Sequence, residues 1–262
     1  MITLWHWHTE PLLLGGILLL GWLYALLVFP FRASLSPDSA RPTKEIAWFY
    51  SALAMFYIAV GSPIDALGEN YLFSVHMFQH ILLMYVCPPM FILGIPSWLI
   101  DATVGRSKWD SNCFRFCVHP VVAGATFTII FSAWHVPSLY EWALQDKLVH
   151  IIEHLSVLLP GLGVWWCFLS PSKQFPRLHG GLQMLFIFGL MIGQLPVFAF
   201  LVFADHVYYP TYLYAPRIMD LSPMEDQIMG GVIMKASNLL VSVVIFGMGF
   251  YALAKDSEES GQ

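Results

Sequence analysis

The stretch that most constrains the fold runs from Tyr71 to Leu93 and contains no Asp, Glu, Lys or Arg. As a helix it is long enough to cross a bilayer, which takes about 20 apolar residues. His76 and His80 lie within it, and their spacing of four places both imidazoles on one helix face, about 6 Å apart along the axis. Polar side chains inside a membrane are costly and commonly mark a functional interior. The pair therefore predicts ligands facing other helices, with packed histidines bonded to the backbone or to Tyr as the alternative.

Further apolar runs extend along the whole chain. Hydrophobic residues make up 58% of the 262 residues and charged residues only 11%, with a mean hydropathy of +0.66, whereas soluble domains are roughly one-quarter charged. The sequence predicts an all-α, polytopic membrane protein with one domain, residues 1–262, built from seven transmembrane helices. The predicted spans cover about residues 12–29, 46–61, 71–93, 118–134, 144–169, 182–203 and 228–253. Residues 62–70, SPIDALGEN, are expected to form a short connection.

The distribution of Lys and Arg predicts the orientation of these spans. The connections after the first, third and fifth spans, together with the tail, hold nine of these residues, whereas the opposite side holds only Lys147 and Arg217. Because cytoplasmic loops carry the excess of positive charge, the N-terminus is expected outside and the C-terminus in the cytoplasm. The net charge of -5 and the absence of a basic block argue against nucleic acid as a partner.

With this topology, eight of the ten histidines fall on the outer side, which favours a metal or cofactor site there. His150 and His154 form a second pair with a spacing of four, at a depth similar to the first pair. Two such helices facing each other would offer up to four imidazoles. The same residues, HIIEH, match the H-x-x-E-H pattern of some zinc peptidases, in which Glu153 would activate water. The pattern identifies no third ligand.

Two other features bear on the outer half of the bundle. Methionines on the third and seventh predicted spans would, together with imidazole, suit Cu(I), although Met is also a common filler of gaps in helix packing. The loop from Ala204 to Gln227 carries four tyrosines and three prolines. It is expected to form an aromatic lid at the membrane interface, acting as a docking surface or as a plain anchor. Lys235 lies within the last span, where the sequence indicates no partner for it.

Several motifs occur together in a fixed order: HMFQH in the third span, His119-Pro120, WHVPSLYEWAL followed by HIIEHL, and MEDQIMGGVIM leading into the last span. This ordered set resembles the seven-helix CtaG family of cytochrome c oxidase assembly factors, over most of the chain from the second span to the seventh. The resemblance implies a protein of the bacterial inner membrane that is not an enzyme. It also implies a role in forming the copper centres of the oxidase.

By match to the motifs of that family, the candidate metal-binding residues are His76, His80, His135, His150, His154 and Asp226. The implied metal is copper, as Cu(I), and the implied partners are cytochrome c oxidase subunits and periplasmic copper chaperones. Two alternatives remain at this point: a b-type cytochrome with one axial histidine from each pair, and an intramembrane zinc hydrolase built on HIIEH.

Overall fold

The computed structural model describes residues 5–260, and this part of the chain is helical, with no strand. Six helices are long and apolar enough to cross a membrane. They are α1 (Pro11–Val28), α3 with α4 (Thr43–Gly61 and Pro63–Asn70), α5 through α6 (Phe73–Leu93), α11 (Lys147–Leu169), α12 (Gly180–Val202) and α14 (Pro223–Ser260). A seventh span exists if α8 (Lys108–Cys117) and α9 (Pro120–Trp134), bent by 53° at their junction, count as one. The all-helical, multi-pass prediction is confirmed with six or seven spans, and the orientation stays a prediction.

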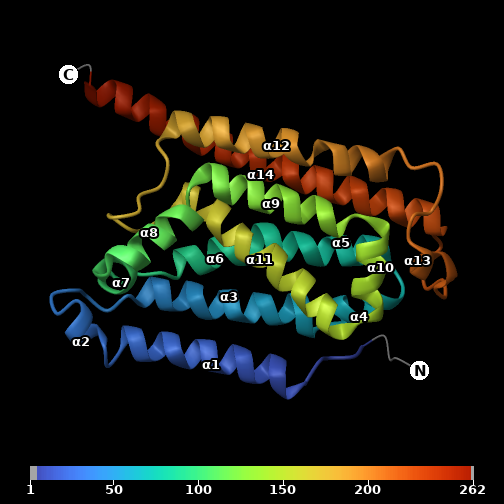
Figure 1. The fold of residues 1–262 in the computed structure, drawn as a ribbon, viewed down its shortest axis with the longest axis horizontal. Coiled ribbons are helices and arrows are strands. Elements are labelled where there is room, and N and C mark those ends of the chain that lie inside the picture. The colour runs from blue at the N-terminus through green and yellow to red at the C-terminus, as the bar shows by residue number, and fades with distance from the viewer. Residues whose placement is uncertain (1–4, 261–262) are drawn as a thin grey trace.

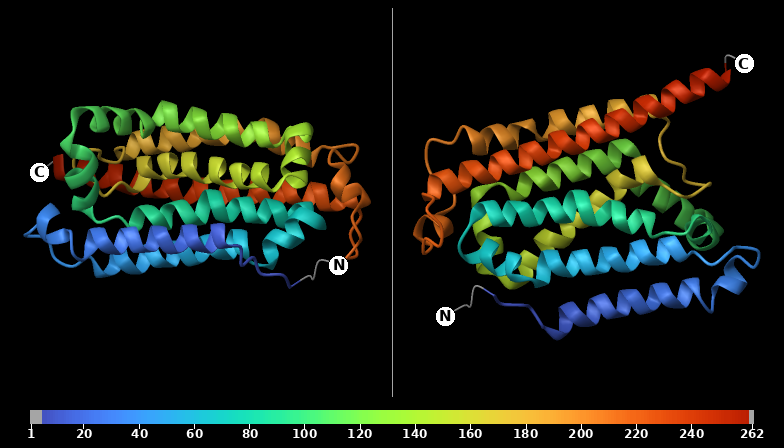
Figure 2. Two further views of the ribbon diagram at one scale, coloured as in Figure 1. Left: turned by 60° about the horizontal axis from the view of Figure 1, so that its bottom comes forward. Right: turned by 180° about the vertical axis from the view of Figure 1, so that it is seen from behind.

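The helices run roughly parallel to one long axis, with the two chain ends at opposite ends of it (Figure 1). α1 lies at the edge of the bundle beside α3, and α12 lies beside α14 on the far side (Figure 2). Between them runs the most buried span, formed by α5 (Phe73–Ile81), the π-helix η1 (Leu82–Val86) and α6 (Cys87–Leu93). This span and α11, its neighbour, carry the two histidine pairs.

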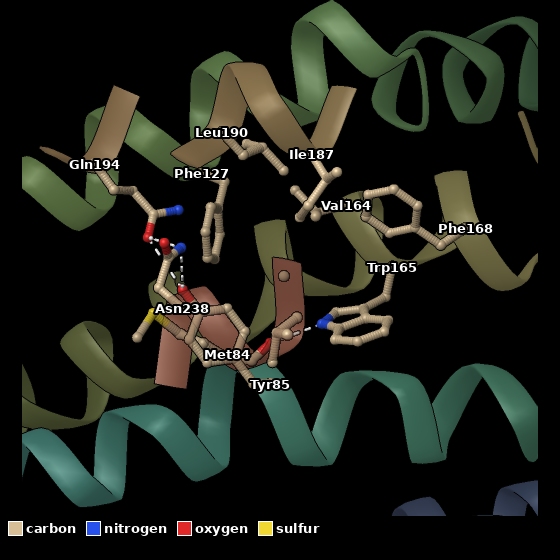
Figure 3. A pocket seen from close by; sticks show the side chains of 12 residues that line it. Met84, Tyr85, Phe127, Val164, Trp165, Phe168, Ile187, Leu190, Gln194 and Asn238 are labelled. Carbon is tan, nitrogen blue, oxygen red and sulfur yellow. Dashed lines mark hydrogen bonds between the residues drawn. The ribbon is translucent and has the colours of Figure 1, made fainter. Parts of the chain in front are cut away.

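The π-helix in the central span has a local cause. Pro88 has no N–H to donate to the carbonyl of Met84 four residues earlier, so the regular helical hydrogen bond cannot form there. The indole Nε1 of Trp165 donates to that carbonyl instead, at 2.9 Å (Figure 3). This hydrogen bond from the indole satisfies the buried Met84 carbonyl and holds α11 against the span that carries His76 and His80.

A polar group lies next to this contact inside the bundle (Figure 3). The Tyr85 hydroxyl donates to Gln194 Oε1 at 3.0 Å, and Asn238 Nδ2 donates to both, at 3.2 Å each. These residues line a cavity of about 10 Å³, close to the room that one water needs. On the same helix as Asn238, Lys235 Nζ lies 5.3 Å from the centre of the Phe198 ring, a cation–π contact that accounts for a cation in this span.

Two expected boundaries are wrong. Residues 63–70 are helix α4 and not a simple connection, because Pro63 suits a first helical turn and Ser62 accepts a hydrogen bond from the Ile64 N–H. The predicted fifth span, residues 144–169, agrees with α11 to within three residues, and Asp146 caps the start of α11 after the short helix α10 (Pro137–Gln145). The charged tail continues α14 as far as Ser260. The remaining short helices are α2 (Arg32–Leu35), α7 (Ser97–Thr103), η2 (Val104–Arg106) and α13 (Pro210–Tyr214).

Candidate metal centre

The structure brings the two histidine pairs together. α5 supplies His76 and His80, α11 supplies His150 and His154, and all four side chains are buried. The ring centroid of His76 lies 5.5 Å from that of His150 and 5.9 Å from that of His154. The ring centroids of His80 and His154 lie 5.7 Å apart. His76 Nε2 and His80 Nε2 approach to 2.9 Å. The four imidazoles that the helical spacing predicts on two facing helices therefore form one cluster.

Glu153 completes this cluster with a carboxylate. Its side chain is fully buried, and Oε1 lies 3.7 Å from His76 Nε2 and 3.5 Å from His80 Nε2. Neither of its oxygens has a hydrogen-bond partner among the described residues. One donor atom each of His76, His80, Glu153 and His154 lies within 4.8 Å of the others. We call these four residues the inner ligand set.

His135 borders the inner ligand set from the end of α9. Its ring centroid is 6.4 Å from that of His80. Its Nδ1 lies 2.6 Å from the Phe131 carbonyl oxygen, and since a carbonyl can only accept, Nδ1 carries the proton. Nε2 is then a free lone pair, buried and without a partner in the described part of the chain. A histidine held through one nitrogen with the other left free is the usual arrangement of a metal ligand.

Asp226 has a different position from the histidines. It lies in the first turn of α14 and its carboxylate caps the start of α5, accepting the Phe73 N–H at 2.7 Å and the Ser74 N–H at 3.1 Å. The Ser74 hydroxyl donates to the same carboxylate at 2.5 Å. Three donors already occupy these oxygens, so Asp226 positions the helix that carries His76 and His80 and lies outside the inner ligand set.

Tyrosines cover the cluster. The Tyr140 and Tyr212 hydroxyls lie 2.8 Å apart, Tyr209 donates to the His135 carbonyl at 3.0 Å, and the Tyr140 ring centroid is 5.1 Å from that of His76. Tyr209 and Tyr212 belong to the loop expected to form an interfacial lid, yet both are buried. Their side chains point into the bundle and are not available as an exposed docking surface.

Acidic residues of α4 extend the polar cluster toward the chain's N-terminal segment. Glu69 Oε1 lies 2.5 Å from His150 Nδ1, and Asp65 Oδ2 lies 3.0 Å from His8 Nε2. The Asp65 and Glu10 carboxylates outweigh burial and raise the pKa of His8 to about 9. Burial alone would raise the pKa of Glu10, but hydrogen bonds from Lys147 and His8 lower it to about 2. The sequence motifs did not single out Asp65 or Glu69, although two acids four residues apart in a strongly apolar region were a usable signal.

The ligand chemistry of the cluster is nitrogen and oxygen. Met77, Met84 and Met234 pack in the apolar core, and the four residues of the inner ligand set offer imidazole nitrogen and carboxylate oxygen. Imidazole with carboxylate suits copper and zinc, whereas it is a poor set for magnesium or calcium. Packing in the core is the alternative that the sequence left open for these three methionines, whereas Met229 is 37% exposed, and methionine ligation of Cu(I) stays a prediction.

Comparison with known proteins gives one family. A family model described as "Cytochrome c oxidase caa3 assembly factor (Caa3_CtaG)" matches residues 22–256. Two uncharacterized proteins, one from Mycobacterium bovis and one from Mycobacterium tuberculosis, are each 22% identical over 214 residues, covering 76% of this chain and 31% of the relative. The chain thus spans about a third of the length of these relatives. No solved structure matches.

Proposed function

The chain belongs to the cytochrome c oxidase caa3 assembly factor family, and from this premise we propose that it holds copper at the inner ligand set and supplies it to a copper centre of the oxidase. The family assists oxidase assembly, which suggests a role that is not catalytic. The partners we propose are oxidase subunits and, as copper donors, periplasmic chaperones. The proposed location is the bacterial plasma membrane.

One observation carries the proposal: a fully buried carboxylate, Glu153, lies among three imidazoles with no hydrogen-bond partner for either oxygen. When the neighbouring imidazoles are neutral, a buried carboxylate charge costs several kcal/mol, on the order of the penalty for removing one ion from water. A cation bound between Glu153 and the Nε2 atoms of His76 and His80 would offset that cost. The unpartnered Nε2 of His154 and of His135 face the same region.

Copper delivery requires binding that is firm yet exchangeable. The outward orientation predicted from the charge distribution would place the cluster on the side where the ion is needed, so that the ion never has to cross the membrane. Imidazole and carboxylate ligands can be replaced one at a time, and release would consist of substitution by the histidines of the oxidase. In this scheme the protein needs no pumping step.

The haem and hydrolase alternatives fit the geometry less well. The rings of the two histidine pairs lie in direct contact, with centroids 5.5 to 5.9 Å apart, which leaves no width for a porphyrin between them. The Glu153 carboxylate lies among the imidazoles, 3.5 and 3.7 Å from two of their nitrogens. A general base of a zinc peptidase instead faces a water that is bound at an open coordination position of the metal. Neither alternative is carried by an observation of its own.

The test is metal analysis of the purified protein together with oxidase maturation in cells at limiting copper. His80→Ala and His154→Ala should each insert normally and bind less copper, and the oxidase should contain less copper and consume less oxygen. Added copper should partly restore both. His206→Ala is the matched control, because that histidine is exposed in the loop after α12. Normal oxidase copper content in both variants would overturn the proposal.

A further inference from the structure

A second group of ligand atoms overlaps the first. One donor atom each of Asp65, His150 and His154 lies within 4.8 Å of the others, and all three side chains are buried. We call these residues the outer ligand set. His154 belongs to both sets, so the two positions are adjacent and share one ligand.

His150 is oriented as a ligand in the outer set. Its Nδ1 faces the Glu69 carboxylate at 2.5 Å, and its Nε2 is buried with no partner in the described part of the chain. A carboxylate behind the far nitrogen of an imidazole fixes the ring and increases the basicity of the free nitrogen. Glu69 retains partial exposure, with 25% of its side chain accessible, so this end of the cluster is the one nearest solvent.

Residues 8–10 lie across that end and form what we call the N-terminal strap. The His8 N–H donates to the Gly61 carbonyl at 2.8 Å, and the Tyr57 hydroxyl donates to the His8 carbonyl at 3.0 Å. At the other end of the strap, Glu10 forms an ion pair with Lys147 at the start of α11. The side chain of the anchored residue, His8, reaches Asp65, with Nε2 lying 3.0 Å from Asp65 Oδ2. The strap therefore occupies Oδ2 of Asp65, while Gln79 Nε2 donates to Oδ1, so that Oδ2 becomes available to an ion only when His8 moves away.

We infer that Asp65, His150 and His154 form an outer copper position through which the ion enters and leaves the inner ligand set. This inference rests on the proposed function and adds a route to it. Two overlapping sets that share His154 allow an ion to move without ever being free. Its bonds to Asp65 and His150 break as bonds to His80 and Glu153 form, while His154 remains bound. No electron is transferred, and the ion keeps its oxidation state.

The acids at this end favour a cation. Asp65 and Glu10 both contact His8 of the strap, Glu10 is also paired with Lys147, and Glu69 contacts His150. Clefts lined by one sign of charge concentrate counter-ions. For the outer position to fill, His8 must leave Asp65, which makes the strap a barrier to both uptake and release.

The test measures exchange rates. Full-length protein in detergent is mixed with a Cu(I)–bicinchoninate complex, and the loss of its colour reports uptake, while excess bicinchoninate added to loaded protein reports release. Asp65→Asn and Glu69→Gln should slow both rates at least tenfold, with the equilibrium constant changed less than threefold. His8→Ala should speed both rates at least threefold. Asp205→Asn, at an exposed carboxylate outside the cluster, is the control and should match the wild type.

Equal rates for wild type, Asp65→Asn and Glu69→Gln, with copper still bound, would overturn the outer position and leave the proposed function standing. A wild type that takes up no copper would overturn both. If Asp65→Asn does not fold, His8→Ala decides the question, because its strap lies at the surface. Unchanged rates in His8→Ala would then refute the route.

Discussion

Glu153→Gln should make the metal-free protein more stable and the copper-loaded protein relatively less stable. In the metal-free protein the Glu153 carboxylate is fully buried and unpartnered, which costs about 1–3 kcal/mol for the unmet hydrogen bonds and more when the group is charged. Gln has the same shape and no charge, and its NH2 group can donate to an unprotonated Nε2 of His76 or His80, which a carboxylate cannot do. We therefore expect a gain of about 1–3 kcal/mol, and for a chain of this size each kcal/mol moves the melting temperature by about 2–4 °C.

Copper should reverse this order. If the wild type is studied at a copper concentration of about 100 times its dissociation constant, binding adds about 2.7 kcal/mol. A hundredfold weaker site in Glu153→Gln would gain only about 0.4 kcal/mol at the same concentration. Copper then favours the wild type by about 2.3 kcal/mol, so the two stability curves should cross as copper is added when the metal-free gain of Glu153→Gln is smaller than this difference.

Thermal unfolding in detergent, first with a chelator and then along a copper titration, measures both effects. Glu141→Gln is the matched control, because the Glu141 carboxylate accepts the Thr211 N–H at 3.1 Å and its hydroxyl at 2.7 Å. The same substitution there should lower stability and leave the copper response unchanged. A Glu153→Gln protein that is less stable than the wild type in chelator would show that the carboxylate is satisfied, and the argument for a cation at this position would fail.

Three further changes test other parts of the structure. Asp226→Ala should cost about 2–3 kcal/mol in thermal unfolding, because the cap of α5 is lost, while the copper affinity of the folded protein changes less than threefold; a large loss of affinity would instead make Asp226 a ligand. Trp165→Phe leaves the Met84 carbonyl unsatisfied and should cost about 1–3 kcal/mol by the same assay. In metal-free protein the strap should be protected from hydrogen exchange most strongly between about pH 4.5 and 6.5. The stability that protonated His8 gives the strap is fully present below its ordinary pKa of 6.5 and is lost as the pH rises through about 9. The stability that ionised Glu10 gives is fully present above 4.5 and is lost as the pH falls through about 2. Protection that is flat from pH 6 to 9.5 would contradict this.

Much of the fold could be predicted because a membrane span is a local pattern. Apolar runs located the long helices, and the spacing of four in each histidine pair placed the rings on one face of each helix. Helix ends were less predictable. Residues 62–70 are too polar to be recognised as part of a span, yet the Ser62 cap and Pro63 are enough to start a helix there.

The parts of the candidate site that the sequence could not give depend on contacts between distant segments. The spacing of Asp65 and Glu69 makes them unusual in an apolar region, but only the position of α4 beside α11 places them at the site. The Asp226 carboxylate accepts a hydrogen bond from the N–H of Phe73, which lies 153 residues earlier in the chain. No sequence periodicity relates the two residues. The HIIEH pattern does indicate Glu153 as a site residue. It does not tell whether Glu153 is a metal ligand or a general base, because these roles differ only in the surroundings of the carboxylate.

The contact between Asp226 and α5 also has a consequence for biogenesis. α5 is synthesised well before α14, whose first turn supplies its cap. Until α14 has inserted, the first N–H groups of α5 are without this acceptor, and the helix that carries His76 and His80 can fray at its start. The start of the helix that carries His76 and His80 therefore reaches its final hydrogen bonding only after α14 has inserted.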